Sequence, residues 1–108
     1  MRFDVLLTDD AVRDIEEVYD YIFEHDNSTK ADYVLGRLET AINGLATNPK
    51  RGACPKELLA LGIREYRQTF FKPYRIIYRI AERRVYIYLI ADGRRDMQTL
   101  LARRLFGT

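Results

Sequence analysis

The chain has 108 residues, the length of one domain, and we expect a single domain over residues 1–108. Its composition, 47% hydrophobic and 31% charged, excludes an intrinsically disordered chain. The single cysteine, Cys54, excludes a disulfide framework, and no signal peptide or long apolar run occurs, so we expect a cytoplasmic protein without a membrane partner.

The net charge of +2 conceals an asymmetry between the two halves of the chain. Residues 1–50 carry five Lys/Arg against eleven Asp/Glu, whereas residues 51–108 carry thirteen against five. Such asymmetry predicts that the basic half binds a nucleic acid or an acidic protein segment. The alternative is a pair of solvated faces of opposite sign.

A strand and a helix are predicted at the start of the chain. Residues 3–7 form a short apolar run of β character, and Thr8 is a candidate N-cap that acidic residues follow. Apolar residues then recur at helical spacing to about Glu24. Asp14 and Glu17 fall beside them, on what we interpret as the solvated face of the helix.

A second apolar stripe runs from Ala31 to Leu45 and predicts a helix that ends at Asn48-Pro49. Residues 25–29 link the two helices, with an Asn suited to a helix end and Ser/Thr suited to the next N-cap. So short a link predicts an antiparallel helical hairpin. Gly36 and Gly44 each weaken the second helix by about 1 kcal/mol relative to Ala, so we expect close packing at one or both.

The second half predicts three strands. Residues 50–62 form a loop with one helical turn, residues 63–71 a strand, and Lys72-Pro73 a turn into a hairpin of residues 74–80 and 85–90. Tyr74, Ile76, Tyr78 and Ile80 alternate with Arg75, Ile77 and Arg79. Successive side chains of a strand point to opposite faces, so we expect arginines to project from a hydrophobic sheet.

Asp96 is suited to cap a last helix over residues 97–106, in which Arg103 and Arg104 occupy the final turn. The predicted order is therefore β-α-α-β-β-β-α. This order is typical of an α+β two-layer sandwich, with the helical hairpin packed on a small, mostly antiparallel sheet and a short C-terminal helix at the end.

The residue types exclude several kinds of site. His25 is the single histidine and Cys54 the single cysteine, so no zinc site of the His/Cys type can be assembled, and no other metal site is expected. A Cys-His nucleophile pair would need these two side chains to meet across the fold, which nothing in the pattern requires. Neither glycine-rich phosphate-binding motif occurs. We expect no cofactor and no catalytic residue.

What remains is a set of arginines and tyrosines on the predicted strands and turns: Arg64, Tyr66, Arg67, Arg75, Tyr78, Arg79, Tyr86, Tyr88, Arg94 and Arg95. Guanidinium groups match phosphate or carboxylate oxygens, and tyrosine rings stack on bases. The alternative for each residue is a structural role, with tyrosines in the core and arginines paired with Glu65, Glu82, Asp92 or Asp96.

Motifs along most of the chain resemble the RelE/ParE superfamily of bacterial type II toxins, and within it the ParE branch. The matching residues are Leu7-Thr8 with Ala11, Asp14 and Ile15; Tyr21-Ile22; Leu45, Pro49 and Gly52; Gly62-Ile63-Arg64; Tyr74-Arg75-Ile76 with Tyr78; and Val85, Ile87 and Ile90 leading to Gly93-Arg94-Arg95-Asp96. Each motif alone is weak, and their order is fairly specific.

The resemblance implies a toxin that a cognate ParD-like antitoxin from the same operon holds inactive, a system associated with plasmid stabilisation. ParE-like members inhibit DNA gyrase by trapping it on cleaved DNA, whereas RelE-like members are ribosome-dependent endoribonucleases. The nucleases commonly place a histidine or tyrosine beyond the last strand for acid/base work, and residues 91–108 contain neither. Arginine is a poor base, so the resemblance favours a gyrase inhibitor that is not an enzyme.

On this hypothesis an exposed cationic surface contacts gyrase, its bound DNA or both, or the acidic segment of the antitoxin. Its candidate residues are Arg64, Arg67, Arg75, Arg79, Arg94, Arg95, Arg103, Arg104 and Phe106. One alternative is a RelE-like mRNA interferase, with Arg64, Arg67, Lys72, Arg75 and Tyr78 gathered round a phosphate and a stacked base. Another is an inactive remnant that serves as a corepressor of its operon.

Overall fold

Strands and helices follow one another in the predicted order in the computed structural model, which describes residues 2–107. They are β1 (Asp4–Leu7), α1 (Asp9–His25), α2 (Ser28–Gly44), the 3₁₀ turn η1 (Pro49–Arg51), α3 (Lys56–Leu59), β2 (Tyr66–Phe71), β3 (Tyr74–Ala81), β4 (Arg84–Asp92) and α4 (Met97–Phe106). The predicted α+β class is confirmed, and α3 is the helical turn expected between residues 50 and 62. No helix within the described residues is both long and apolar enough to cross a membrane.

The strands form one sheet in the order β1-β4-β3-β2. β2, β3 and β4 pair antiparallel, while β1 lies at the edge and pairs parallel with β4. The pairing of β3 with β4 shifts between Ile77, opposite Leu89, and Tyr78, opposite Ile87. Tyr88 is therefore the extra residue of a β-bulge. β1 ends opposite Ile87. Beyond this point, the backbone N–H and C=O groups on that edge of β4 need hydrogen-bond partners other than β1.

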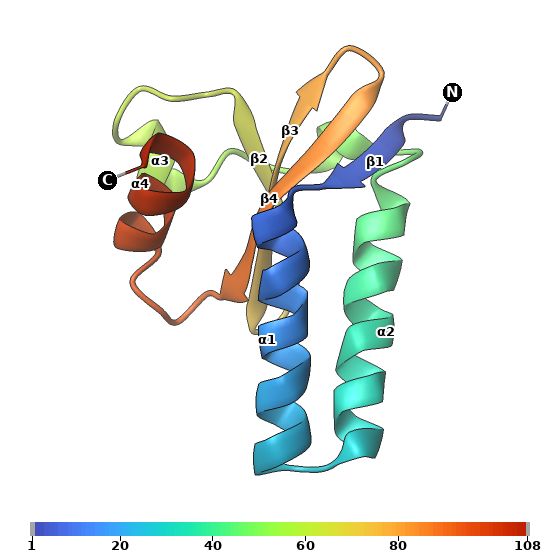
Figure 1. The fold of residues 1–108 in the computed structure, drawn as a ribbon. Helices are drawn as coiled ribbons and strands as arrows, with labels where there is room; N and C mark the ends of the chain where they lie inside the picture. Colours follow the sequence, from blue (N-terminus) through green and yellow to red (C-terminus); the bar gives the residue numbers. More distant parts are fainter. Residues whose placement is uncertain (1, 108) are drawn as a thin grey trace.

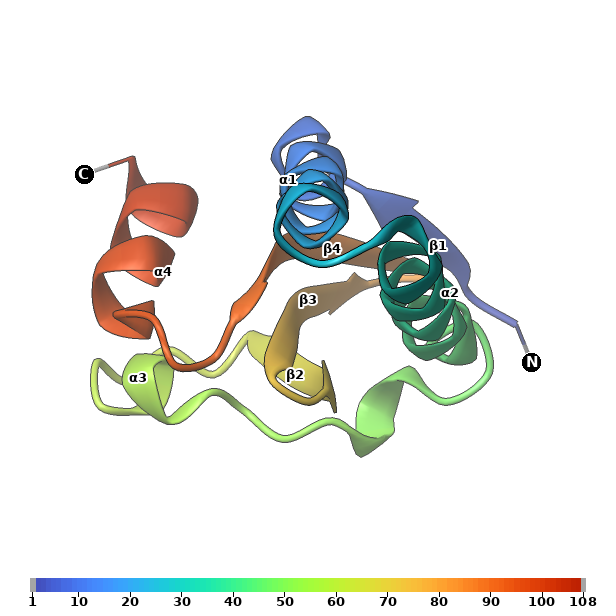
Figure 2. The same ribbon diagram turned by 90° about the horizontal axis from the view of Figure 1, so that it is seen from below.

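Two helical layers cover the sheet unequally. α1 and α2 run side by side across one face and extend past the end of the sheet (Figure 1). Their apolar stripes meet the alternate side chains Ile76, Tyr78, Val85 and Ile87 in the larger core cluster. α3 and α4 lie on the other side of the sheet (Figure 2) and enclose a smaller cluster around Ile77, Leu89 and Leu101.

The caps set the helix starts. Thr8 Oγ1 accepts from Ala11 N at 3.1 Å, and Asp96 accepts from Thr99 N at 3.1 Å, as the sequence predicts for both residues. The expectation for the link between α1 and α2 is wrong: Asn27, rather than Ser or Thr, caps α2 by accepting from Lys30 N at 2.7 Å. The residue that ends α1 is also not the Asn, because the C-cap of α1 is Asp26.

The strand predicted over residues 63–71 begins three residues later than expected, as β2 at Tyr66. Residues 63–65 do not pair with β3, because Ile63 N donates to Leu58 O at 2.9 Å and closes the turn after α3. Strand pairing begins at Tyr66, opposite Arg79.

The close packing expected at Gly36 and Gly44 is also wrong, since a Cβ at either position would meet nothing within 4 Å. The tight glycine is Gly52, where a Cβ would collide with the Tyr78 hydroxyl and with Gln68 O. Gly52 therefore allows η1 to approach the sheet.

Candidate functional site

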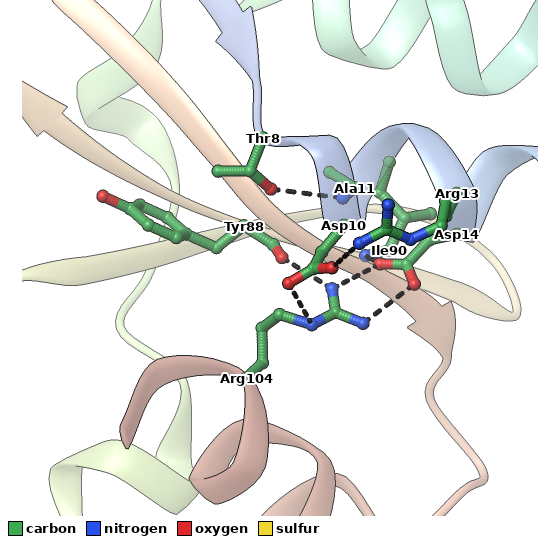
Figure 3. Close-up of polar contacts among 8 residues, drawn as sticks. All are labelled: Thr8, Asp10, Ala11, Arg13, Asp14, Tyr88, Ile90 and Arg104. Atoms are coloured by element: carbon green, nitrogen blue, oxygen red, sulfur yellow. Dashed lines mark hydrogen bonds and ion pairs between the residues drawn. The ribbon is translucent and has the colours of Figure 1, made fainter. Parts of the chain in front are cut away.

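Asp14 of α1 and Arg104 of α4 form an ion pair that joins the two ends of the chain. Arg104 Nη1 donates to Asp14 Oδ2 at 2.7 Å and Nη2 to Oδ1 at 3.0 Å, while Nε lies 3.7 Å from Asp10 Oδ2 (Figure 3). The side chains are 11% and 20% exposed for Asp14 and Arg104. The hydrogen bonds that Arg104 donates to Asp14 raise the pKa of its guanidinium above the ordinary value. This contact holds α4 against α1.

The same pair completes the edge of β4 where β1 has ended. Ile90 N donates to Asp14 Oδ2 at 2.9 Å, and Arg104 Nη1 donates to Tyr88 O at 2.7 Å (Figure 3). Asp14 thus supplies the acceptor, and Arg104 the donor, that a neighbouring strand would otherwise provide. Both side chains serve the fold.

Arg75 of β3 is held just as firmly on the side of the sheet that faces α3. Its Nη1 and Nη2 donate to the two carboxylate oxygens of Glu57 at 2.8 and 2.9 Å, and Nε donates to Gln68 Oε1 at 2.9 Å. Arg75 is 9% exposed. The hydrogen bonds from Arg75 hold the pKa of Glu57 below its ordinary value. A Cβ at Gly93 would lie 2.8 Å from Arg75 Cδ, so this glycine makes room for the arginine.

Arg75 and Arg104 therefore correct the expectation that the candidate arginines are displayed to a partner. Each guanidinium is engaged by a carboxylate inside the protein. Arg67 is also used internally, because its Nη1 donates to Lys50 O and Gly52 O at 2.8 Å each and ties the loop after α2 to β2.

The remaining candidates are exposed but lie on different elements. Arg64 precedes β2, Arg79 lies on β3, Arg94 and Arg95 form the turn after β4, and Arg103 and Phe106 lie on α4. Phe106 is 47% exposed. The structure thus distributes the exposed candidates over at least three parts of the surface.

The Arg94-Arg95 turn borders a groove of about 750 Å³ between the helical hairpin and the end of the sheet. Arg94 Nη2 lies 2.5 Å from Asp92 Oδ2, and its side chain is 80% exposed. Lys72 lines the groove from the β2–β3 turn, and Glu17, Tyr21 and Tyr33 line it from the helices. Burial, followed by the charge of Asp92, raises the pKa of the Tyr74 hydroxyl in the same wall. The groove therefore has aromatic walls and a mixed charged lining, in which the cations Lys30, Lys72, Arg94 and Arg95 are accompanied by the acids Asp14, Glu17, Asp26 and Asp92.

The residues of the interferase alternative are divided between the two faces of the sheet. Tyr78 is fully buried on the face covered by α1 and α2, where its hydroxyl donates to Pro49 O at 2.5 Å. Burial raises the pKa of this hydroxyl. Arg75 lies on the opposite face with Glu57. Among the described residues no His, Cys, Asp or Glu side chains are grouped in a way that could hold a metal ion.

Asp14 and Glu57 are the two acids whose importance sequence reasoning missed. The interpretation of Asp14 as part of a solvated face is wrong, since its carboxylate joins α1, β4 and α4. A signal was present: Asp14 is three residues from Ala11 and four from Val18, so it flanks the apolar stripe. Glu57 lies 18 residues before Arg75, and no spacing rule connects the two.

Comparison with known proteins places this fold. The chain is similar to a solved structure of the chromosomal ParDE toxin–antitoxin system from P. aeruginosa, with a TM-score of 0.71 at 16% identity over 84% of this chain and 96% of the other. It is also similar to the toxin–antitoxin complex RelBE2 from Mycobacterium tuberculosis, with a TM-score of 0.57 at 21% identity over 85% and 92%. A search of curated protein sequences returned no match.

The sequence itself matches one family. Residues 5–97 fit the family described as the ParE toxin of the type II toxin-antitoxin system parDE. The match runs from β1 to the first residue of α4 and so includes the Arg94-Arg95 turn. The chain therefore belongs to the ParE toxin family of type II toxin–antitoxin systems, as its sequence motifs predict.

Proposed function

We propose that the protein inhibits DNA gyrase by binding it and trapping it on cleaved DNA, and that a cognate ParD-like antitoxin neutralises it. The proposal rests on membership of the ParE family, and it puts the protein in the cytoplasm with its target. In this proposal the toxin acts by contact, without a cofactor and without a catalytic step of its own.

One observation favours contact over catalysis: Arg75 and Tyr78, which the interferase alternative gathers round one phosphate, lie on opposite faces of the sheet. Cleavage of RNA needs one group to accept the proton of the 2′-hydroxyl and another to protonate the leaving oxygen. The Tyr78 hydroxyl is buried, and the guanidinium of Arg75 is saturated by Glu57 and Gln68.

The Arg94-Arg95 turn is the surface that we assign to the target. Both arginines are exposed on the rim of the aromatic groove, and Lys72 extends the same rim. An acidic segment of the antitoxin would pair with these three cations and bury apolar surface as it becomes ordered. Arg103 and Phe106, exposed on α4, extend the proposed contact beyond the turn.

Induction of the toxin in cells that lack the antitoxin tests the proposal. We expect loss of plasmid supercoiling and double-strand DNA breaks, with messenger RNA intact, and we expect coexpression of the antitoxin to prevent both effects. Messenger RNA cut within translated frames, with supercoiling unchanged, would contradict the proposal and favour the mRNA interferase. A product that causes neither effect would instead favour the inactive remnant that serves as a corepressor of its operon.

A matched pair of variants assigns the surface. Arg94→Ala with Arg95→Ala should abolish the DNA breaks, whereas Arg13→Ala with Arg37→Ala, which removes two exposed arginines from the helical hairpin, should leave them unchanged. Thermal denaturation of both variants shows whether the fold is retained. Full activity of the Arg94/Arg95 variant would show that the target binds at another surface.

A further inference from the structure

The chain between α2 and β2 runs along the outer edge of the sheet. β2 is the last strand of the sheet, and Gln68 N donates to Ala53 O at 2.8 Å, so the chain before α3 lies beside this strand. The Cys54 thiol donates to Arg64 O at 3.6 Å and brings the chain after α3 back to the same place. Figure 2 shows this segment passing β2 before it reaches α3. We name residues 50–64 the loop edge.

The loop edge has a net positive charge. Its exposed cations are Lys50, Arg51, Lys56 and Arg64. None of these four side chains forms an ion pair with any other residue that the structure describes. Two acids accompany them in the chain: Glu57, whose carboxylate is engaged by Arg75, and Glu65, which is exposed. Four free cations therefore stand against one free carboxylate.

The residue types of the loop edge favour contacts to phosphates over contacts to bases. No aromatic residue occurs between residues 50 and 65, so unpaired bases have no ring on which to stack. Guanidinium and ammonium groups bind phosphate oxygens, and such contacts do not depend on the base sequence. Lys50 and Lys56 are six residues apart, so their Cα atoms are separated by at most about 21 Å, whereas one turn of duplex DNA measures about 34 Å. The loop edge is therefore short enough for a single duplex to span it.

We propose that the loop edge binds the phosphate backbone of duplex DNA through its four exposed cations. Duplex DNA presents one negative charge for about every 1.7 Å of its axis, whereas an extended acidic peptide presents at most one for about every 3.3 Å. The duplex therefore matches closely spaced cations such as Lys50 and Arg51 better than an acidic protein segment does. The inference rests on the proposed function for the source of the DNA, because gyrase holds the duplex that it cleaves. The toxin would contact gyrase through the Arg94-Arg95 turn and the DNA through the loop edge.

Fluorescence anisotropy with the purified protein and a labelled duplex of about 20 base pairs tests the proposal without gyrase. We expect the duplex to bind at least as tightly as a single strand of the same length, with a slope of log affinity against log salt of about −3 to −4 for four phosphate contacts. A labelled polyglutamate of similar length should bind more weakly. Absence of duplex binding in about 50 mM salt, tighter binding of the single strand, or equal binding of the polyglutamate would overturn the proposal and leave the proposed function standing.

Two matched double variants test whether the loop edge is the site. Arg51→Ala with Arg64→Ala should weaken duplex binding at least about tenfold in about 50 mM salt and reduce the salt slope by about 0.9 for each lost contact. Arg13→Ala with Arg37→Ala removes the same charge from the helical hairpin and should leave binding unchanged. Arg51→Lys with Arg64→Lys keeps the charge and should retain most of the affinity. Equal losses in the two alanine variants, with thermal denaturation showing both folded, would overturn the proposal.

Leu59 and Leu61 distinguish DNA from an amphipathic acidic segment. They are 40% and 57% exposed and lie between Lys56 and Arg64 in the chain. Leu59→Ser with Leu61→Ser should leave duplex binding unchanged, because phosphate contacts do not use apolar side chains, whereas a protein segment would lose part of its contact area. A loss of duplex binding as large as that of the Arg51/Arg64 alanine variant, in a folded protein, would show that the loop edge does not act through phosphate contacts.

Discussion

Arg104 and Arg94 lie ten residues apart and both pair with an aspartate, yet their surroundings differ. Arg104 is 20% exposed and meets Asp14 from 90 residues away, whereas Arg94 is 80% exposed and meets Asp92 from two residues away. A buried pair that spans the chain fixes the fold, while an exposed local pair contributes little to stability and leaves the guanidinium accessible. Separating the two kinds of arginine is therefore the main step in finding the binding surface.

Removal of Asp14 is expected to give the largest effect on stability. Asp14→Ala leaves Arg104 partly buried without its carboxylate and leaves Ile90 N without an acceptor. We expect the free energy of unfolding to fall by about 2 to 4 kcal/mol, measured by urea denaturation. Asp14→Asn should lose less, because the amide oxygen can still accept from Ile90 N.

A double-mutant cycle sharpens this prediction. If Arg104 acts through Asp14, Asp14→Ala combined with Arg104→Ala should destabilise the protein by less than the two single losses added together. Strictly additive losses would mean that the two residues stabilise the fold independently and that the pair does not link α4 to α1.

Removal of the Glu57 carboxylate is expected to give the second largest loss of stability, and the size of this loss depends on pH. The pKa of Glu57 in the folded protein lies below its ordinary value of 4.5, because Arg75 hydrogen-bonds the carboxylate. Its contribution is therefore fully present above about pH 4.5 and is lost as the pH falls through the folded pKa. Glu57→Gln should lower stability by about 1 to 3 kcal/mol at neutral pH, and the difference from the unchanged protein should shrink in acid. A constant difference across the acid limb would contradict this account.

Much of the fold follows from local patterns in the sequence. Thr8 and Asp96 are recognisable caps, and the alternation from Tyr74 to Ile80 divides the side chains between the two faces of the sheet as expected. Strand pairing and the β-bulge are not local: nothing near Tyr88 signals that it is the extra residue opposite β3. The pattern places the start of β2 three residues too early, because Ile63, although apolar, closes the turn after α3.

The roles of the arginines were less predictable than the strands that carry them. Alternation places Arg75 on the correct face but cannot show that Glu57 approaches it from α3. Arg104 fits the last turn of a helix equally well as a displayed cation or as the partner of Asp14. In both cases the deciding contact joins residues distant in the sequence.

Gly52→Ala is expected to lower the stability of the protein by an intermediate amount. The added methyl group would meet the Tyr78 hydroxyl and Gln68 O, and Tyr78 is fully buried and cannot retreat freely. We expect a loss of about 1 to 3 kcal/mol by overpacking, measured by urea denaturation. Gly36→Ala is the control: it adds a methyl group to an open helix surface and should stabilise α2 by up to about 1 kcal/mol. Equal effects of the two changes would show that Gly52 is not packed as described.

The smallest expected change in stability belongs to the surface assigned to the target. Arg94→Ala with Arg95→Ala should alter the free energy of unfolding by no more than about 0.5 kcal/mol, because both side chains are exposed and the Arg94 pair is local. The hydrogen bonds from Arg94 hold the pKa of Asp92 below its ordinary value of 3.8, so the pKa of Asp92 should rise in this variant, as measured by NMR titration of the carboxylate. A lowered melting temperature, comparable to that of Asp14→Ala, would place Arg94 among the structural arginines and remove the turn as the proposed contact with gyrase.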